Sequence, residues 1–151
     1  MGFLAKWGPS AARVALGLIF FTFGLNYFLE FLPAPPPPPA QALAFVGGLA
    51  AGGYVFPLIK VIEAVAGVAL LANRFVPLAL TLLAPIIVNI AAFHFLLAPS
   101  YAMPVVLLVL ELYLAWSYRD LYRPMFTARA VPTARKRPEQ QFHRDFTAPA
   151  H

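Results

Sequence analysis

Four long apolar stretches dominate this chain of 151 residues and constrain its fold more than any other feature. They run from about residue 11 to 32, 54 to 72, 76 to 97 and 103 to 118. A helix needs roughly 20 predominantly apolar residues to cross a bilayer, so each stretch is close to the length of one span. The sequence therefore predicts an all-α integral membrane protein, in which residues 1–126 form a four-helix transmembrane bundle.

The composition excludes a soluble domain. Hydrophobic residues make up 61% of the chain and charged residues 11%, whereas soluble domains carry about 25% charged residues. The net charge of +5 can indicate nucleic-acid binding, but most basic residues follow the last apolar stretch. We therefore expect the lipid bilayer and membrane proteins as partners, and no nucleic acid. Because the sequence contains no cysteine, it supplies no disulfide, thiol redox centre or thiolate metal ligand.

Residues 33–53 separate the first two apolar stretches and have two parts. The proline tract 33–39 ends any helix, because proline lacks the amide donor and restricts the residue before it. Residues 41–53 are apolar but too short to span, and they contain paired glycines, which predicts an interfacial or re-entrant helix. A cleaved signal peptide is disfavoured for the first stretch, because its apolar run is long and no clean small-residue cleavage site follows it.

The basic residues predict the orientation in the membrane. If both termini are cytoplasmic, ten of the eleven lysines and arginines lie on the cytoplasmic side, and only Lys60 lies toward the outside. This distribution follows the positive-inside rule. Residues 127–151 are polar, basic and proline-bearing, which predicts a disordered cytoplasmic tail.

Three polar residues lie deep in three different apolar stretches. Glu63, Asn89 and Glu111 each lie about eight or nine residues from the predicted outer end of their stretch, which gives them a similar depth at ~1.5 Å per helical residue. A charged group in hydrocarbon costs at least ~2.5–3.5 kcal/mol, so such groups usually face the interior and are paired or functional. The three residues predict a polar pocket in the outer half of the bilayer, although such groups also serve as plain interhelical hydrogen bonds.

Three more polar residues extend the predicted pocket toward the outer surface. Lys60 lies three residues before Glu63 and can pair with it on one helix face. Asn26 and His94 lie at shallower depths in their stretches. No recognised metal-binding motif joins these residues, so we expect no metal site.

The position of His94 depends on the shape of its helix. His94 follows Asn89 by five residues and points about 140° away from it on an ideal helix. It is expected to reach the same pocket only if the helix is kinked or loosened, and Pro85 is the expected site of a kink.

Three segments resemble the DoxX family of small bacterial membrane proteins. They are Ala12–Asn26 (ARVALGLIFFTFGLN), Ile62–His94 (IEAVAGVALLANRFVPLALTLLAPIIVNIAAFH) and Tyr122–Phe126 (YRPMF). The resemblance implies a four-helix membrane bundle in the bacterial plasma membrane. Some members, and the similar DoxD proteins, are associated with thiosulfate–quinone oxidoreductases, terminal quinol oxidases or other membrane redox complexes. Glu63, Asn89 and His94 match polar positions of the family pattern.

Together, the polar pocket and the resemblance favour a subunit of a quinone-linked oxidoreductase or a similar redox assembly, with quinone as the candidate cofactor. Under this hypothesis the candidate ligand-binding residues are Asn26, Lys60, Asn89 and His94, and the candidate proton relay is Glu63 with Glu111. Two alternatives stay open. In the first alternative, the chain is a non-catalytic scaffold that docks partners. In the second, it forms a small-solute or proton pathway, for which no inverted repeat is visible in the sequence.

Overall fold

The computed structural model describes residues 3–34 and 36–128, and every regular element among them is helical. The elements are α1 (Phe3–Leu29), α2 (Ala40–Ala51), α3 (Val55–Leu71), α4 (Val76–Leu96), α5 (Ala102–Ser117), α6 (Arg119–Tyr122) and the 3-10 helix η1 (Arg123–Phe126). The chain divides into two units, residues 1–119, which contain α1 to α5, and residues 120–151. The predicted tail, residues 127–151, lies outside the described residues apart from its first two positions.

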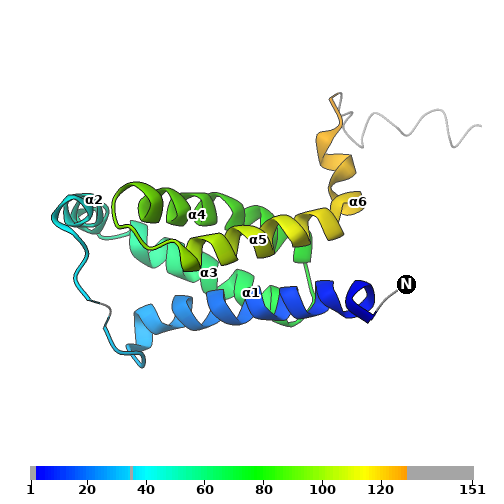
Figure 1. Ribbon diagram of the computed structural model, residues 1–151, viewed down its shortest axis with the longest axis horizontal. Helices are drawn as coiled ribbons and strands as arrows, with labels where there is room; N and C mark the ends of the chain where they lie inside the picture. The colour runs from blue at the N-terminus through cyan, green and yellow to red at the C-terminus, as the bar shows by residue number, and fades with distance from the viewer. Residues whose placement is uncertain (1–2, 35, 129–151) are drawn as a thin grey trace, which may run out of the picture. The chain divides into compact units, whose positions relative to one another are not determined.

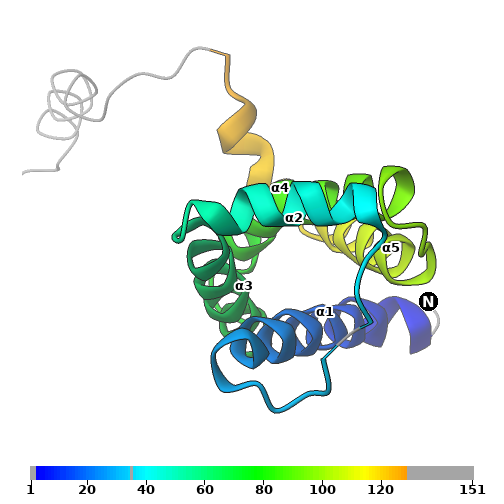
Figure 2. The ribbon, with the colours of Figure 1, turned by 90° about the vertical axis from the view of Figure 1, so that its left-hand side faces the viewer.

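Helices α1, α3, α4 and α5 lie side by side, as Figure 1 shows, and α2 crosses one end of them (Figure 2). The axes of α2 and α3 differ by 89°. The turn between them contains Gly53 at φ +69°, a left-handed conformation that glycine adopts without strain. The sequence prediction of a separate short helix at residues 41–53 is confirmed, since α2 has 12 residues.

The helices have the length and surface of a membrane protein. Residues Trp7–Leu29 and Val76–Leu96 are each long and apolar enough to cross a membrane, and the number of candidate spans rises to four if each bent helix pair counts as one. Large apolar side chains also face outward in the middle of the helices, for example Val65, Val88 and Leu112, which are 62%, 61% and 67% exposed. Such surfaces favour contact with hydrocarbon over water. The described chain is thus an all-helical membrane protein with two to four candidate spans.

The four long helices enclose one hydrophobic core. It contains Leu16 and Phe20 of α1, Ala66 and Leu70 of α3, Leu80, Leu83 and Ile87 of α4, and Leu107 and Leu114 of α5. Two glycines lie where α1 and α3 are in close contact. A Cβ on Gly67 would lie 2.5 Å from the Phe21 backbone nitrogen, and one on Gly24 would lie 2.7 Å from the Ala64 backbone nitrogen. Small residues of this kind allow membrane helices to pack backbone against backbone.

The first helix differs from its predicted bounds of 11–32. It begins already at Phe3 and ends at Leu29. At its end Glu30 adopts a left-handed φ of 49°, and the Leu32 backbone N–H donates to the Asn26 Oδ1 over 2.7 Å. The end of α1 is therefore determined by a side chain that satisfies the backbone, and it precedes the proline tract that was predicted to break the helix.

Arg13 lies inside the protein, although the sequence suggested only a cytoplasmic flanking charge. Its side chain is buried, and Nη1 donates to the Leu70 carbonyl and, over 3.3 Å, to the Leu71 carbonyl. These carbonyls belong to the last turn of α3, where four C=O groups have no partner within the helix. A cation there also interacts favourably with the helix dipole. Arg13 therefore joins α1 to the C-terminal end of α3.

Replacing Arg13 with methionine is expected to lower the free energy of unfolding by about 2 kcal/mol, because charge-assisted hydrogen bonds to buried carbonyls are lost. The matched control is Arg74→Met, since Arg74 is exposed in the turn before α4 and its loss is expected to change stability by less than about 0.5 kcal/mol. Chemical denaturation in detergent measures both. Equal effects of the two substitutions would contradict a structural role for Arg13.

Candidate functional site

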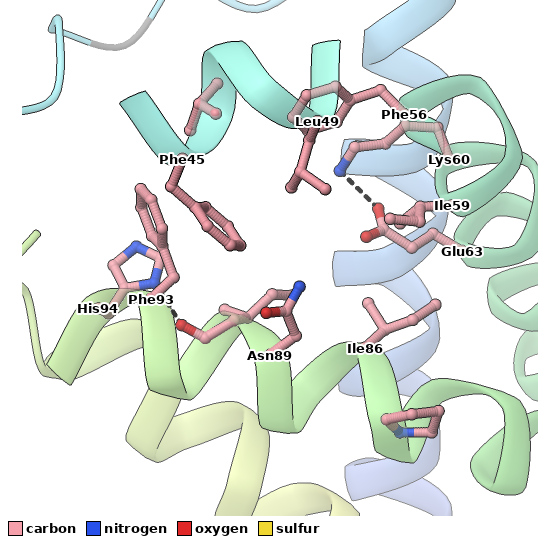
Figure 3. Close-up of a pocket in the computed structure, with 13 residues that line it drawn as sticks. Phe45, Leu49, Phe56, Ile59, Lys60, Glu63, Ile86, Asn89, Phe93 and His94 are labelled. Carbon is pink, nitrogen blue, oxygen red and sulfur yellow. Dashed lines mark hydrogen bonds and ion pairs between the residues drawn. The ribbon is translucent and has the colours of Figure 1, made fainter. Parts of the chain in front are cut away.

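A cavity of about 610 Å³ lies beneath α2, between α2, α3 and α4. Figure 3 shows its lining side chains. They are Phe45, Val46 and Leu49 of α2, Phe56, Ile59, Lys60 and Glu63 of α3, and Pro85, Ile86, Asn89, Ile90, Phe93 and His94 of α4. Four of the six residues that the sequence singled out for a site thus meet in one cavity. They are Lys60, Glu63, Asn89 and His94.

Helix α3 supplies an ion pair to the cavity wall. Lys60 Nζ lies 2.7 Å from Glu63 Oε2, and the two side chains are 23% and 3% exposed. The spacing of three residues places both on one helix face, as the sequence predicted. The pair brings an ammonium and a carboxylate into the cavity with no net charge.

Helix α4 supplies an amide and an imidazole. Figure 3 shows Asn89 on the floor of the cavity, between the Lys60–Glu63 pair at one end and His94 at the other. The His94 Nδ1 lies 2.8 Å from the Ile90 carbonyl oxygen. Because a carbonyl only accepts, Nδ1 carries the proton in this contact.

His94 reaches the cavity although α4 runs as one helix from Val76 to Leu96. The sequence prediction required a kinked or loosened helix, because Asn89 and His94 point about 140° apart. The lining positions of α4 extend from Pro85 to His94 and cover about half of the helix circumference at 100° per residue. The cavity is wide enough around α4 to include both directions, so both side chains can line it without a kink in the helix.

Helix α2 forms the roof of the cavity, and its lining side chains Phe45, Val46 and Leu49 are apolar. The Phe45 ring of α2 lies 5.9 Å from the Phe93 ring of α4, measured between centroids. A hydrogen bond of 2.9 Å from Gln41 Nε2 to the Leu97 carbonyl joins the start of α2 to the end of α4. The sequence prediction missed this roof. The spacing of Ala42, Phe45 and Leu49 places them on one helix face and indicates an apolar face of α2, but it does not indicate which helices this face covers.

Glu111 lies elsewhere. It is 7% exposed, belongs to the buried face of α5 with Leu107 and Leu114, and does not line the cavity. Its Oε2 is buried without a hydrogen-bond partner among the described residues. The sequence placed Glu111 at the depth of Glu63, but Glu111 does not line the cavity that Glu63 lines. A proton relay between the two carboxyls stays a prediction.

Asn26 also lies outside the cavity. Its side chain accepts the Leu32 N–H and lines a separate hollow near the end of α1, together with Tyr27 and Glu30. This amide therefore has a local structural partner, and Asn26 is not among the residues that line the cavity.

The described residues contain no group of three or more histidine, aspartate or glutamate side chains that could hold a metal ion. Comparisons with protein-family models, with curated proteins and with solved structures find no match for this chain. The cavity is therefore interpreted from its own chemistry. That chemistry is an apolar, partly aromatic space with hydrogen-bonding groups at two ends and an amide between them.

Proposed function

We propose that the cavity beneath α2 binds the headgroup of a membrane quinone and that the chain is a DoxX-like subunit of a quinone-linked redox assembly. The observation that supports this is the arrangement of the lining. Lys60 and Glu63 lie at one end, His94 at the other, and aromatic rings lie between them (Figure 3). A quinone has the matching pattern, because two oxygens project from opposite sides of a flat apolar ring.

The size of the cavity fits such a ligand. Sites for small molecules and cofactors usually have volumes of about 300–1,000 Å³ and combine apolar walls with a few polar groups. The observed volume of about 610 Å³ accommodates a substituted ring and the first part of an apolar tail. In this proposal Asn89 hydrogen-bonds one headgroup oxygen, His94 hydrogen-bonds the other, and Glu63 exchanges protons with the bound ring.

The proposed arrangement in the membrane makes α1, α3, α4 and α5 four spans, with both termini in the cytoplasm of a bacterial cell. Helices α3 and α5 have 17 and 16 residues, which correspond to roughly 25 Å at 1.5 Å per residue and approach the thickness of the hydrocarbon core. Helix α2 would then lie along the outer interface, and a quinone would enter the cavity from the outer leaflet. The DoxX resemblance supports the four spans, and the positive-inside pattern supports the orientation.

Binding of a short-chain quinone to the protein in nanodiscs tests the proposal. Asn89→Leu is expected to weaken binding of both redox forms about tenfold, because one hydrogen bond in an apolar site contributes about this factor. Asn26→Leu is the matched control, since it removes the same amide outside the cavity and is expected to leave the affinity unchanged. Unchanged affinity in Asn89→Leu, or no saturable binding to the unmodified protein, would contradict the proposal.

A further inference from the structure

The hydrogen bond of His94 defines what the rest of its ring offers to a ligand. Since Nδ1 carries the proton that the Ile90 carbonyl accepts, Nε2 of the neutral imidazole has a lone pair and no hydrogen. No hydrogen bond joins Nε2 to another described residue. His94 therefore presents a hydrogen-bond acceptor at its end of the cavity.

Glu63 presents a second acceptor at the opposite end. Its Oε2 accepts from Lys60 over 2.7 Å, and no described residue donates to Oε1. Figure 3 shows this second carboxylate oxygen on the cavity side of the ion pair. An ionised carboxylate only accepts hydrogen bonds. The two ends of the cavity thus both require a donor from the ligand.

The other polar groups of the cavity, Asn89 and Lys60, do not change this need for hydrogen-bond donors on the ligand. The Asn89 amide both donates and accepts, so it suits a carbonyl or a hydroxyl equally. The remaining Lys60 protons also suit either form, because a hydroxyl oxygen accepts as a carbonyl oxygen does. Only the acceptors of Glu63 and His94 discriminate between the two forms of the ligand, since a carbonyl oxygen facing them leaves two lone pairs opposed.

We propose that the cavity selects the reduced, dihydroxy form of the headgroup over the oxidised, dicarbonyl form, with Glu63 Oε1 and His94 Nε2 each accepting one hydroxyl proton in a hydrogen bond. This inference depends on the proposed function, because it concerns the redox form of a ligand at the same site. It assigns the specificity to two named acceptor atoms and to the Ile90 carbonyl that determines the tautomer of His94.

Three ligands with one ring test the inference. They are a short-chain benzoquinone, its quinol and the dimethyl ether of that quinol, titrated without oxygen against the protein in nanodiscs. The ether keeps the shape of the quinol and lacks its two donors. The quinol is expected to bind at least about tenfold more tightly than either of the others, because each of them leaves buried acceptors unsatisfied.

Two variants test whether Glu63 and His94 cause the preference for the quinol over the quinone. His94→Phe keeps a ring and removes the acceptor, and Glu63→Gln replaces an acceptor oxygen with an amide that can also donate. Each is expected to weaken quinol binding and to strengthen quinone binding, so that the preference for the quinol falls about tenfold, and Asn26→Leu should keep the full preference. The thermal midpoint of each variant shows that the protein remains folded.

The outcomes separate the two proposals. If the quinone or the ether binds as tightly as the quinol, or more tightly, the selection of the reduced form is overturned, while the proposal of a quinone site stands. An unchanged preference in both variants overturns the assignment to Glu63 and His94. Failure of all three ligands to bind overturns the proposed function together with this inference.

Discussion

Replacing Lys60 with methionine is expected to lower the free energy of unfolding by about 3 kcal/mol, because it leaves the Glu63 carboxylate buried without its cation. Glu63 is 3% exposed at the side chain, and its Oε2 makes one charge-assisted contact of 2.7 Å with Lys60. The expected loss is at the lower end of the range for a broken buried pair, since the Lys60 side chain is itself 23% exposed. Chemical denaturation in detergent measures the change.

Two further variants show whether the effect comes from the unpaired charge. The double substitution Lys60→Met with Glu63→Gln removes both charges and is expected to recover at least half of the lost stability. Arg123→Met breaks another i,i+3 pair of the same chain, between Arg123 and Asp120, whose side chains are 80% and 68% exposed. That exposed pair should contribute less than about 0.5 kcal/mol. A double variant as unstable as Lys60→Met would contradict this explanation.

Gly67→Ala is expected to destabilise the protein by about 3 kcal/mol, because the added methyl group meets backbone atoms that cannot move aside. A Cβ on Gly67 would lie 2.5 Å from the Phe21 nitrogen and 2.9 Å from the Gly17 oxygen, both on α1. The two helices would have to separate, and α3 also carries the Lys60–Glu63 pair of the cavity. The thermal midpoint and the quinone affinity should therefore both fall.

Gly47→Ala is the matched control for this prediction. Gly47 lies inside α2, and a Cβ built there has no neighbour within 4 Å. In a helix interior alanine is favoured over glycine by up to about 1 kcal/mol, so this variant should be neutral or slightly more stable. Similar losses in Gly47→Ala and Gly67→Ala would show that close packing between α1 and α3 is not the cause.

The sequence predicted which polar residues lie at a similar depth better than it predicted the direction in which each of them points from its helix. Counting residues from the helix ends gave Glu63, Asn89 and Glu111 a similar depth, but depth is only one coordinate. The direction in which a residue points depends on which helices are neighbours. Glu111 lies on the face of α5 that carries Leu107 and Leu114, and this face packs into the core. Hydropathy alone does not contain that information.

The roof of the cavity shows a second limit of sequence reasoning. The sequence indicated a short helix before α3, and its existence is confirmed. Its direction depends on the turn at Gly53 and on the long-range hydrogen bond from Gln41 to the Leu97 carbonyl. Both depend on tertiary contacts, so the aromatic contact between Phe45 and Phe93 could not be predicted from local pattern.

Photoaffinity labelling tests the central claim most directly, because it locates the ligand on the chain. A short-chain quinone with an azido group on its ring would be irradiated with the protein in nanodiscs, and the labelled peptides would be identified by mass spectrometry. The account predicts label on residues 45–63 of α2 and α3 and on residues 85–94 of α4, competed by excess unlabelled quinol. Label confined to α1 or α5, or label that the quinol does not displace, would contradict it.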